Sequence, residues 1–267
     1  MKKNNIIPDI LPVGESTSRR HALKMAAGTV AGMMMTSLGM SALSAGKTPD
    51  GVTKKKIFLP KAFVYTELQI AIPFEEFSWD VANKSLLQQP GLLNKTWLSG
   101  IGNNSLGGIY AFDSVEKARK FVTGYFPAEA KKSGVAQTTR LFDAAIVDNA
   151  SRDLQSVHFG HHLDHIPAAF VYTELQVSVP FDEFPWEVRN KVLKKQPGLL
   201  AKTWLSGLNT NSLGGIDAFD TIENARQYTL VDFPRIAAKS NAAFYTRIFD
   251  ARVVEAASRQ MHSPFYS

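Results

Sequence analysis

The sequence contains no cysteine. This absence excludes disulfide bonds, thiol nucleophiles, iron–sulfur ligation and cysteine-based zinc sites. The folded chain must therefore be stabilised by its hydrophobic core alone, and about 200 residues are enough to form one.

Histidine is absent from most of the chain. His21 lies near the N-terminus, His262 near the C-terminus, and the other four fall between His158 and His165. This distribution argues against a histidine-based metal centre in the main fold. The His158–His165 segment could gather imidazoles with Asp164 around a divalent metal. Gly160 and the lack of a helical pattern favour a polar linker instead, so we expect no metal there.

Long hydrophobic runs are also missing beyond the N-terminal segment, which predicts that no stable membrane span remains in the mature chain. Arg19 and Arg20 precede a modestly apolar run rich in Ala, Gly and Met that ends near Ala45. This order is typical of a cleavable export signal, and the paired arginines resemble the twin-arginine type. We therefore expect recognition by the twin-arginine export machinery and a periplasmic or other extracytoplasmic location. A membrane anchor or a disordered tail are the alternatives.

Half of the excess of basic over acidic residues lies in this predicted signal. The first 45 residues hold five lysines and arginines and two acidic residues, so 25 basic side chains face 22 acidic ones in the remainder. The isoelectric point near 9.4 is therefore no argument for nucleic-acid binding, which requires a clustered basic face. We expect no nucleic-acid partner.

The main positive feature is a tandem duplication. "AFVYTELQ" occurs at Ala62 and Ala169, and "KTWLSG" occurs at Lys95 and Lys202, always 107 residues apart. Roughly three positions in five are identical across the two copies, and a unit of about 90 residues can be a small domain rather than a solenoid repeat. We predict a signal at 1–45 and a linker at 46–60, followed by a first domain at 61–150, a His-rich linker at 151–167, a second domain at 168–259 and a tail at 260–267.

Each copy predicts the element order β-α-β-β-α-β. Strand-like segments alternate with helical ones and are separated by Pro-Gly and Gly-rich turns. In the first copy the expected elements cover residues 63–73, 74–89, 92–100, 107–113, a helix beginning at Asp113, and 135–147. Asp113 and Glu116 have the spacing of a helix-capping pair, as do Asp220 and Glu223. Pro127 and Pro234 predict a kink or break in the second helix.

The first strand of each copy has two different faces. Val64, Thr66 and Leu68 alternate with Tyr65, Glu67 and Gln69. The first set suits packing beneath helices, whereas the second suits a cavity wall or a solvent face. A single copy leaves this second face uncovered. We therefore predict that the two sheets cover each other, with these residues and their counterparts Tyr172, Glu174 and Gln176 at the seam.

The pattern "QPGLLNKTWLSG…NSLGGIYAFDS…RLFDA" resembles the YdhR-like mono-oxygenase family of the dimeric α/β-barrel superfamily. The residues that carry the resemblance include Pro90-Gly91, Lys95, Trp97, Gly107-Gly108 and Phe142-Asp143. The resemblance implies an α+β fold in which two ferredoxin-like βαββαβ domains form the α/β barrel within one chain. Further association into a homo-oligomer is compatible with it.

The resemblance also implies the chemistry. In better understood relatives a phenolic or quinol-like molecule reacts with dioxygen inside the barrel without metal or flavin, so no cofactor is expected. Such a reaction needs a base and an aromatic pocket. The candidate catalytic residues are Glu67, Trp97 and Tyr110 with the counterparts Glu174, Trp204 and Asp217, and the candidate substrate-binding residues are Tyr65, Gln69, Tyr172 and Gln176.

Plainer interpretations stand beside this one. An inward tryptophan is usually core, and a carboxylate at a sheet seam is more often half of an interface hydrogen bond or ion pair than a catalyst. A non-catalytic binding protein for a hydrophobic molecule and a purely structural role are the alternative functions. Because Tyr110 is replaced by Asp217 in the second copy, the two pockets should differ chemically.

Overall fold

The structure, a computed structural model, describes residues 59–267 apart from 71 and 178. The predicted export signal at 1–45 and almost all of the predicted linker at 46–60 lie outside the described residues.

The first repeat folds in the predicted order. Its elements are β1 (Ala62–Gln69), the 3₁₀ turn η1 (Phe74–Glu76), α2 (Trp79–Leu86), β2 (Leu92–Gly100), β3 (Ser105–Phe112), α3 (Val115–Lys120), the π-helical turn η2 (Phe121–Tyr125), α4 (Phe126–Ser133) and β4 (Gln137–Asp143). The short α5 (Asp148–Asp153) and η3 (Val157–Phe159) follow.

The second repeat has the same order. Its elements are β5 (Ala169–Gln176), η4 (Phe181–Glu183), α6 (Trp186–Leu193), β6 (Leu199–Gly207), β7 (Ser212–Phe219), α7 (Ile222–Gln227), the π-helical turn η5 (Tyr228–Asp232), α8 (Phe233–Lys239), β8 (Phe244–Asp250), α9 (Glu255–Gln260) and η6 (Pro264–Tyr266).

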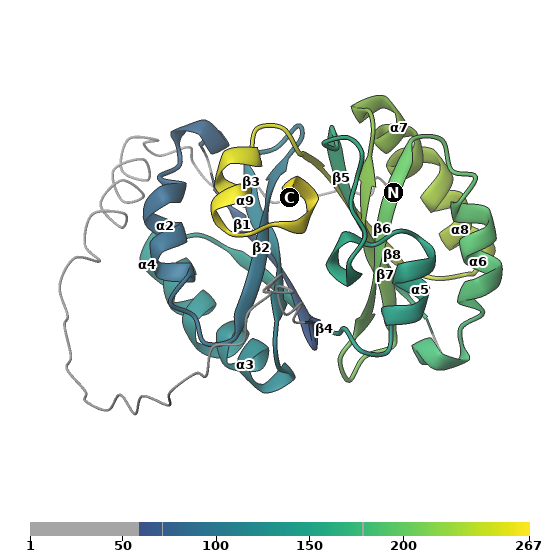
Figure 1. Ribbon diagram of the computed structural model, residues 1–267, viewed down its shortest axis with the longest axis horizontal. Helices are drawn as coiled ribbons and strands as arrows, with labels where there is room; N and C mark the ends of the chain where they lie inside the picture. Colours follow the sequence, from purple (N-terminus) through teal and green to yellow (C-terminus); the bar gives the residue numbers. More distant parts are fainter. Residues whose placement is uncertain (1–58, 71, 178) are drawn as a thin grey trace, which may run out of the picture.

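The eight strands form one closed antiparallel barrel in the order β1-β3-β2-β8-β5-β7-β6-β4. Each repeat supplies four neighbouring strands, and Figure 1 shows the two halves side by side with the strands between two outer groups of helices. The predicted α+β fold and the α/β barrel within one chain are therefore confirmed.

The two halves of the barrel are joined by short seams. At one seam Ser99 and Gly100 of β2 pair with Asp250 and Phe249 of β8. At the other, Phe142 and Asp143 of β4 pair with Gly207 and Ser206 of β6. By contrast, β1 and β3 pair over their whole length. Side chains inside the barrel must therefore supply much of the contact between the halves.

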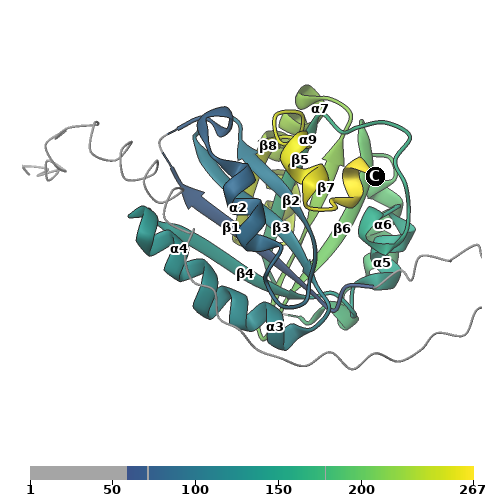
Figure 2. The same ribbon diagram turned by 60° about the vertical axis from the view of Figure 1, so that its left-hand side comes forward.

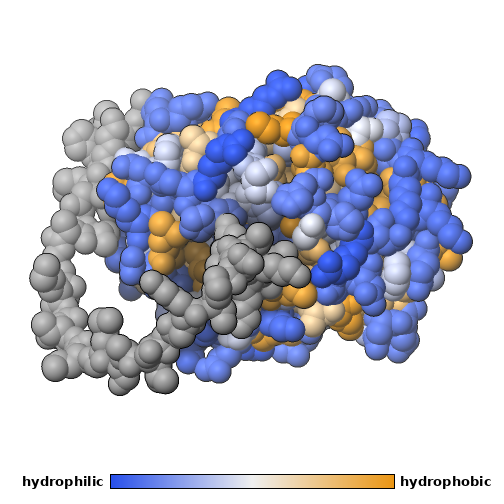
Figure 3. Space-filling view, in the orientation of Figure 1, coloured by the Kyte–Doolittle hydropathy of each residue, from blue (hydrophilic) through white to orange (hydrophobic). Residues whose placement is uncertain are grey.

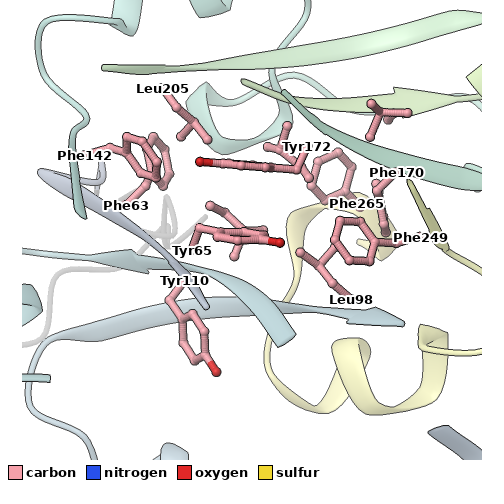
Figure 4. Packing of buried hydrophobic residues seen from close by; sticks show 14 of the residues in the cluster. Phe63, Tyr65, Leu98, Tyr110, Phe142, Phe170, Tyr172, Leu205, Phe249 and Phe265 are labelled. Atoms are coloured by element: carbon pink, nitrogen blue, oxygen red, sulfur yellow. The ribbon is translucent and has the colours of Figure 1, made fainter. Parts of the chain in front are cut away.

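The interior of the barrel is filled by aromatic rings. Tyr65 and Tyr172 stack with their ring centroids 4.0 Å apart and their planes 9° from parallel, as Figure 4 shows. Phe142 and Phe249 pack against this pair from either half. The predicted seam of Tyr65, Glu67 and their counterparts exists, but stacked rings occupy it.

The segments that follow each repeat pack on the opposite repeat. Figure 1 shows α9, near the C-terminus, lying over the first half, while α5 lies over the second. The backbone N–H of Lys95 in β2 donates to the carbonyl of Met261, 3.0 Å away, and the N–H of Lys202 in β6 donates to that of Leu154, also 3.0 Å away. Residues 151–167 and 260–267 therefore include structural parts of the partner half, rather than only a linker and a tail.

Helices cover the outer face of the barrel, and Figure 2 shows α2 and α4 flanking the sheet of the first half.

Two local predictions about the second helix of the first repeat need correction or refinement. The second helix is capped by Ser114, whose hydroxyl accepts from the Lys117 N–H at 3.2 Å, and not by Asp113, which pairs with the Lys117 ammonium. The irregularity expected at Pro127 takes the form of the π-helical turn just before it, and such turns often occur at functional sites.

The outer surface is mostly hydrophilic, with smaller hydrophobic areas between the charged side chains (Figure 3). Within the described part of the chain, no helix combines the length and the apolar character needed to cross a membrane.

Candidate functional site

The first cavity lies between the sheet of the first repeat and the helices α2 and α4. Its volume is about 110 Å³, and its wall includes Lys95, Trp97, Tyr110, Tyr125 and Phe126. A dry apolar cavity of about 150 Å³ is able to bind benzene. The first cavity is therefore of the size that suits a single-ring compound.

This location corrects the predicted pocket between the two sheets. Tyr110 packs against Phe121 on the helix side, with ring centroids 5.0 Å apart. Figure 4 shows it pointing away from the stacked Tyr65 and Tyr172 rings. Trp97 contacts Phe74 and Phe77, which also lie outside the barrel. Glu67 therefore lies on the opposite face of the sheet from Trp97 and Tyr110, and the predicted catalytic residues do not form one site.

Lys95 is the most unusual residue of the first cavity. It has 0 % exposure, and its Nζ has no hydrogen-bond partner among the described residues. Burial holds the pKa of Lys95 well below its ordinary value, because transfer out of water penalises the charged form. The face of the Trp97 indole lies under this nitrogen, with 2.6 Å from Nζ to the ring centroid, and would partly stabilise an ammonium. The cavity thus contains an amine with reduced proton affinity.

One glycine of a Gly-Gly pair makes room for this lysine. Gly107 and Gly108 lie on β3 opposite β2. A Cβ at Gly108 would lie 2.6 Å from Cε of Lys95, closer than side chains approach each other in folded proteins. The repeated "SLGGI" motif, predicted only as a strand and turn feature, thus accommodates the lysine.

Replacing Lys95 with Met should raise the free energy of unfolding at neutral pH. Because the unfolded lysine binds a proton with a pKa of about 10.4 and the buried one has a lower pKa, the unfolded state binds more protons in this range. The stability of the wild type therefore rises with pH up to the ordinary lysine value. Urea unfolding from pH 7 to pH 10 should show the advantage of Lys95→Met shrinking as pH rises. A constant or growing difference would contradict the lowered pKa of the buried Lys95 amine.

Trp97 is held by residues from both repeats. Its indole Nε1 donates to Oδ1 of Asn83 in α2 at 2.9 Å, and its backbone N–H donates to Oγ of Ser258 in α9 at 3.0 Å. Nδ2 of Asn83 donates in turn to the carbonyl of Ala257 at 3.0 Å. The C-terminal segment therefore helps to fix the wall of the first cavity.

Replacing Asn83 with Ala should destabilise the protein by about 1–3 kcal/mol, because the buried indole N–H would lose its acceptor. Chemical denaturation measures the loss. Asn190 holds Trp204 in the same way at 3.0 Å, so Asn190→Ala should cost a similar amount. A loss below 0.5 kcal/mol in both variants would argue against this anchoring role.

The second cavity lies at the equivalent place in the second repeat and is chemically different. Here Nζ of Lys202 lies 2.6 Å from Oδ1 of Asp217, and both side chains are almost fully buried. Burial lowers the pKa of Lys202 and raises that of Asp217, while their mutual attraction opposes both changes. Lys95 has Tyr110 in the place of this carboxylate. The predicted chemical difference between the pockets thus becomes a paired lysine in one and an unpaired lysine in the other.

Glu67 lies inside the barrel and already has several hydrogen-bond donors. Its carboxylate accepts from the Tyr65 hydroxyl at 2.7 Å, from the Gln69 amide at 2.6 Å and from the Tyr245 hydroxyl at 2.9 Å. Arg247 of the other half lies 3.3 Å away. Burial alone would raise the pKa of Glu67, but these donors and the Arg247 charge lower it overall. The carboxylate therefore has the geometry of a link between the halves.

Glu174 has a similar set of partners. It accepts from Tyr172 and Gln176, each at 2.6 Å, and pairs with Arg140 of the first half at 3.3 Å. The four predicted substrate-binding residues, Tyr65, Gln69, Tyr172 and Gln176, thus bind the two glutamates and do not line either cavity described above.

The linker histidines do not lie in one environment. His158 is buried between Phe63 and Phe265, its Nδ1 lies 3.0 Å from the Thr203 hydroxyl, and burial lowers its pKa to about 3. His161, His162 and His165 are exposed. In residues 59–267, leaving aside 71 and 178, no group of three or more His, Asp or Glu side chains could hold a metal ion.

The sequence contained a signal for the two lysines that the prediction did not use. Lys95 lies in the middle of the strand-like segment "LLNKTWLSG", on the same face as Trp97. A lysine in the interior of such a strand is rarely buried without a partner, so its position alone marks it as a candidate.

Comparisons with known proteins agree with the fold. The model of the family described as "Putative mono-oxygenase ydhR" matches residues 67–149. The first repeat therefore matches this family over nearly its whole length. The resemblance predicted from the sequence is therefore confirmed. No curated protein matches the chain.

Several solved structures are similar to this chain at low identity. A putative monooxygenase from Fusobacterium nucleatum is 10% identical, with 72% of this chain and 93% of that one covered and a TM-score of 0.44. An anthrone oxidase-like protein is 11% identical, with 72% and 91% covered and a TM-score of 0.44. A monooxygenase-like protein from Listeria innocua is 10% identical, with 73% and 98% covered and a TM-score of 0.40. The fold described above rests on the strand pairing and not on these similarities.

Proposed function

We propose that this ydhR-type protein is a mono-oxygenase that oxidises a small aromatic molecule in the first cavity, with Lys95 as the base. The observation that carries the proposal is a buried, unpartnered amine facing an aromatic cavity of about 110 Å³. The proposal keeps the cofactor-independent chemistry expected from the sequence and moves it from the barrel interior to the space between sheet and helices. It also replaces Glu67 as the base.

Lys95 is suited to removing a proton from a weakly acidic substrate. A neutral amine can accept a proton, whereas an ammonium that already pairs with a carboxylate cannot. Once Lys95 is protonated, its charge would be stabilised by the substrate anion beside it and by the Trp97 ring face. Proton transfer within such a pair contributes typically 10²–10⁴-fold to a rate.

The proposed substrate has an acidic CH₂ group next to an aromatic ring, and dioxygen is the co-substrate. Lys95 takes one hydrogen of the CH₂ as a proton, and the electron pair left on carbon reduces dioxygen as the C–O bond forms. The resulting peroxide is protonated by the Lys95 ammonium. Loss of the second C–H proton with cleavage of the O–O bond then gives a ketone and water. One oxygen atom enters the product and one enters water, so no external reductant is needed.

Oxygen uptake by the purified full-length protein tests the proposal, with phenylacetone, a single-ring compound that has an acidic benzylic CH₂, as the probe. With ¹⁸O₂, mass spectrometry should find one labelled atom in the ketone product. Lys95→Met should lower the rate at least 100-fold. Lys84→Met makes the same change at an exposed position of α2 and should leave the rate unchanged.

Two outcomes would overturn the proposal. Full turnover by Lys95→Met would remove Lys95 as the base. Binding of the probe without oxygen uptake would instead favour a binding protein for hydrophobic molecules. The proposed export and extracytoplasmic location depend on residues 1–45, and cell fractionation of an Arg19→Lys/Arg20→Lys variant tests them separately.

A further inference from the structure

The second cavity is much larger than the first. It lies between the sheet of the second repeat and the helices α6 and α8, and its volume is about 550 Å³. The substitution of Tyr110 by Asp217 accounts for part of the difference, because the first repeat fills the same place with a phenol ring against Phe121. Tyr125, at the mouth of the first cavity, corresponds to Asp232. The second repeat therefore has room for a two-ring molecule.

The inner end of the second cavity has unused hydrogen-bond acceptors. One oxygen of Asp217 pairs with Lys202, but Oδ2 has no partner among the described residues, and neither has Oγ1 of Thr173. Both side chains are at most 1 % exposed. Thr173 lies in the cavity wall together with Lys202, the partner of Asp217. In the first repeat, the Thr66 hydroxyl has the Tyr110 hydroxyl 3.5 Å away. A buried polar atom without a partner is costly, and a ligand with an N–H or O–H group at the inner end of the cavity would satisfy the Thr173 hydroxyl.

The mouth of the second cavity is positively charged. Arg189, Arg235 and Lys239 lie in its wall, and none of the three forms an ion pair within the described part of the chain. Asp232 is the acidic group at this mouth, and it accepts from the Gln196 and Gln227 amides at 3.1 and 3.3 Å. The wall therefore contains three cationic side chains without an ion-pair partner among the described residues, and its carboxylate, Asp232, already has two donors.

The first repeat lacks this charge. Ala82 and Ala128 occupy the positions equivalent to Arg189 and Arg235. Lys132, the equivalent of Lys239, pairs with Glu129. The two cavities thus differ at both ends. One has a free amine and a neutral mouth, and the other has an internal ion pair and a basic mouth.

We infer that the second cavity is a separate binding site for an organic anion with an apolar body, an inner N–H or O–H group and an outer carboxylate or sulfonate. The inner group donates to the Thr173 hydroxyl, the apolar body lies against Trp204 and Phe233, and the anionic group faces Arg189, Arg235 and Lys239. Lys202 is already paired with Asp217, so this site binds its ligand and does not react with it. The inference does not depend on turnover in the first cavity.

The test uses two fluorescent probes that differ by one charged group. 6-Hydroxynaphthalene-2-sulfonate has an O–H and a sulfonate at opposite ends of two fused rings, whereas 2-naphthol lacks only the sulfonate. Titration of the full-length protein should show one site that binds the sulfonate at least fivefold more tightly, and the preference should fall as salt concentration rises. Equal affinities for the two probes would overturn the proposed role of the basic mouth.

Variants locate the site. Arg189→Ala/Arg235→Ala should weaken sulfonate binding about fivefold or more and change binding of the neutral probe less than twofold. Arg226→Gln, which removes a cation from α7 outside the cavity, should change neither affinity. Asp217→Tyr should abolish binding of both probes by filling the cavity, and the first repeat already contains this lysine–tyrosine arrangement. If Asp217→Tyr does not fold, Val192→Trp narrows the mouth from an exposed position and should weaken both probes at least tenfold. Unchanged probe binding in whichever of these two variants folds would show that the probes bind elsewhere, and would overturn the proposed site.

Discussion

Replacing Lys202 with Met should lower the free energy of unfolding by about 3–5 kcal/mol, because it leaves the buried Asp217 carboxylate without its partner. Lys95→Met, the matched change in the first repeat, should instead raise the free energy of unfolding, because Lys95 has no hydrogen-bond partner among the described residues. Guanidinium denaturation of the two variants at pH 7 measures both effects.

Two further results would identify the cause. The double variant Lys202→Met/Asp217→Leu should recover most of the lost stability, since apolar replacement of a whole buried pair is often nearly neutral. Lowering the pH should reduce the loss in Lys202→Met, because burial raises the pKa of Asp217 and a protonated carboxyl needs no counter-ion. Similar losses in Lys95→Met and Lys202→Met would show that the two lysines are not in different electrostatic states.

Replacing Tyr110 with Asp should lower the turnover of the first cavity 10²–10⁴-fold, the range expected when a general base is lost. The new carboxylate would pair with Lys95, as Asp217 pairs with Lys202 at 2.6 Å, and would keep the amine protonated. The second repeat shows that the same backbone accommodates this pair. Oxygen uptake under saturating substrate measures the effect.

Tyr110→Phe is the matched control because it keeps the ring and removes only the hydroxyl. It should lose less than tenfold, since the Tyr110 hydroxyl has only a long contact with Thr66, at 3.5 Å. Circular dichroism and unfolding of Tyr110→Asp must show a folded protein. A folded Tyr110→Asp protein with wild-type turnover would exclude Lys95 as the base.

Much of the fold could be predicted from the sequence. The constant offset of 107 residues and the period-two pattern of β1 predicted two four-stranded sheets that pack face to face or curl into a barrel. The family resemblance implied the barrel, which the structure has. The alternation in β1 also placed Tyr65 and Glu67 correctly inside it. These features could be predicted because hydrophobic alternation fixes which residues of one strand share a face.

The position of the site could not be predicted in the same way. Both faces of β3 are buried, and all eight of its residues from Ser105 to Phe112 lie in the interior. Alternation alone therefore could not decide whether Tyr110 faces the barrel or the helices. The bulge between Leu92 and Asn94 of β2 shifts the register, so Trp97 could not be placed relative to Glu67 by counting.

The packing of the segment after each repeat on the opposite repeat could not be predicted from the sequence either. Residues 255–266 are chemically similar to residues 148–159, and nothing local shows that each packs on the opposite repeat. Their contacts with Asn83 and Asn190 become apparent only when the two halves are placed together.

Fusion of the two halves has a consequence for how such a protein can change. In a symmetric pair of separate identical chains, one codon determines both copies of a side chain, so a gain in one pocket must be tolerated in the other. Joined in one polypeptide, positions 110 and 217 can vary independently, and the chain has kept a tyrosine at one and an aspartate at the other. Covalent linkage thereby allows a division of labour between pockets that began as duplicates.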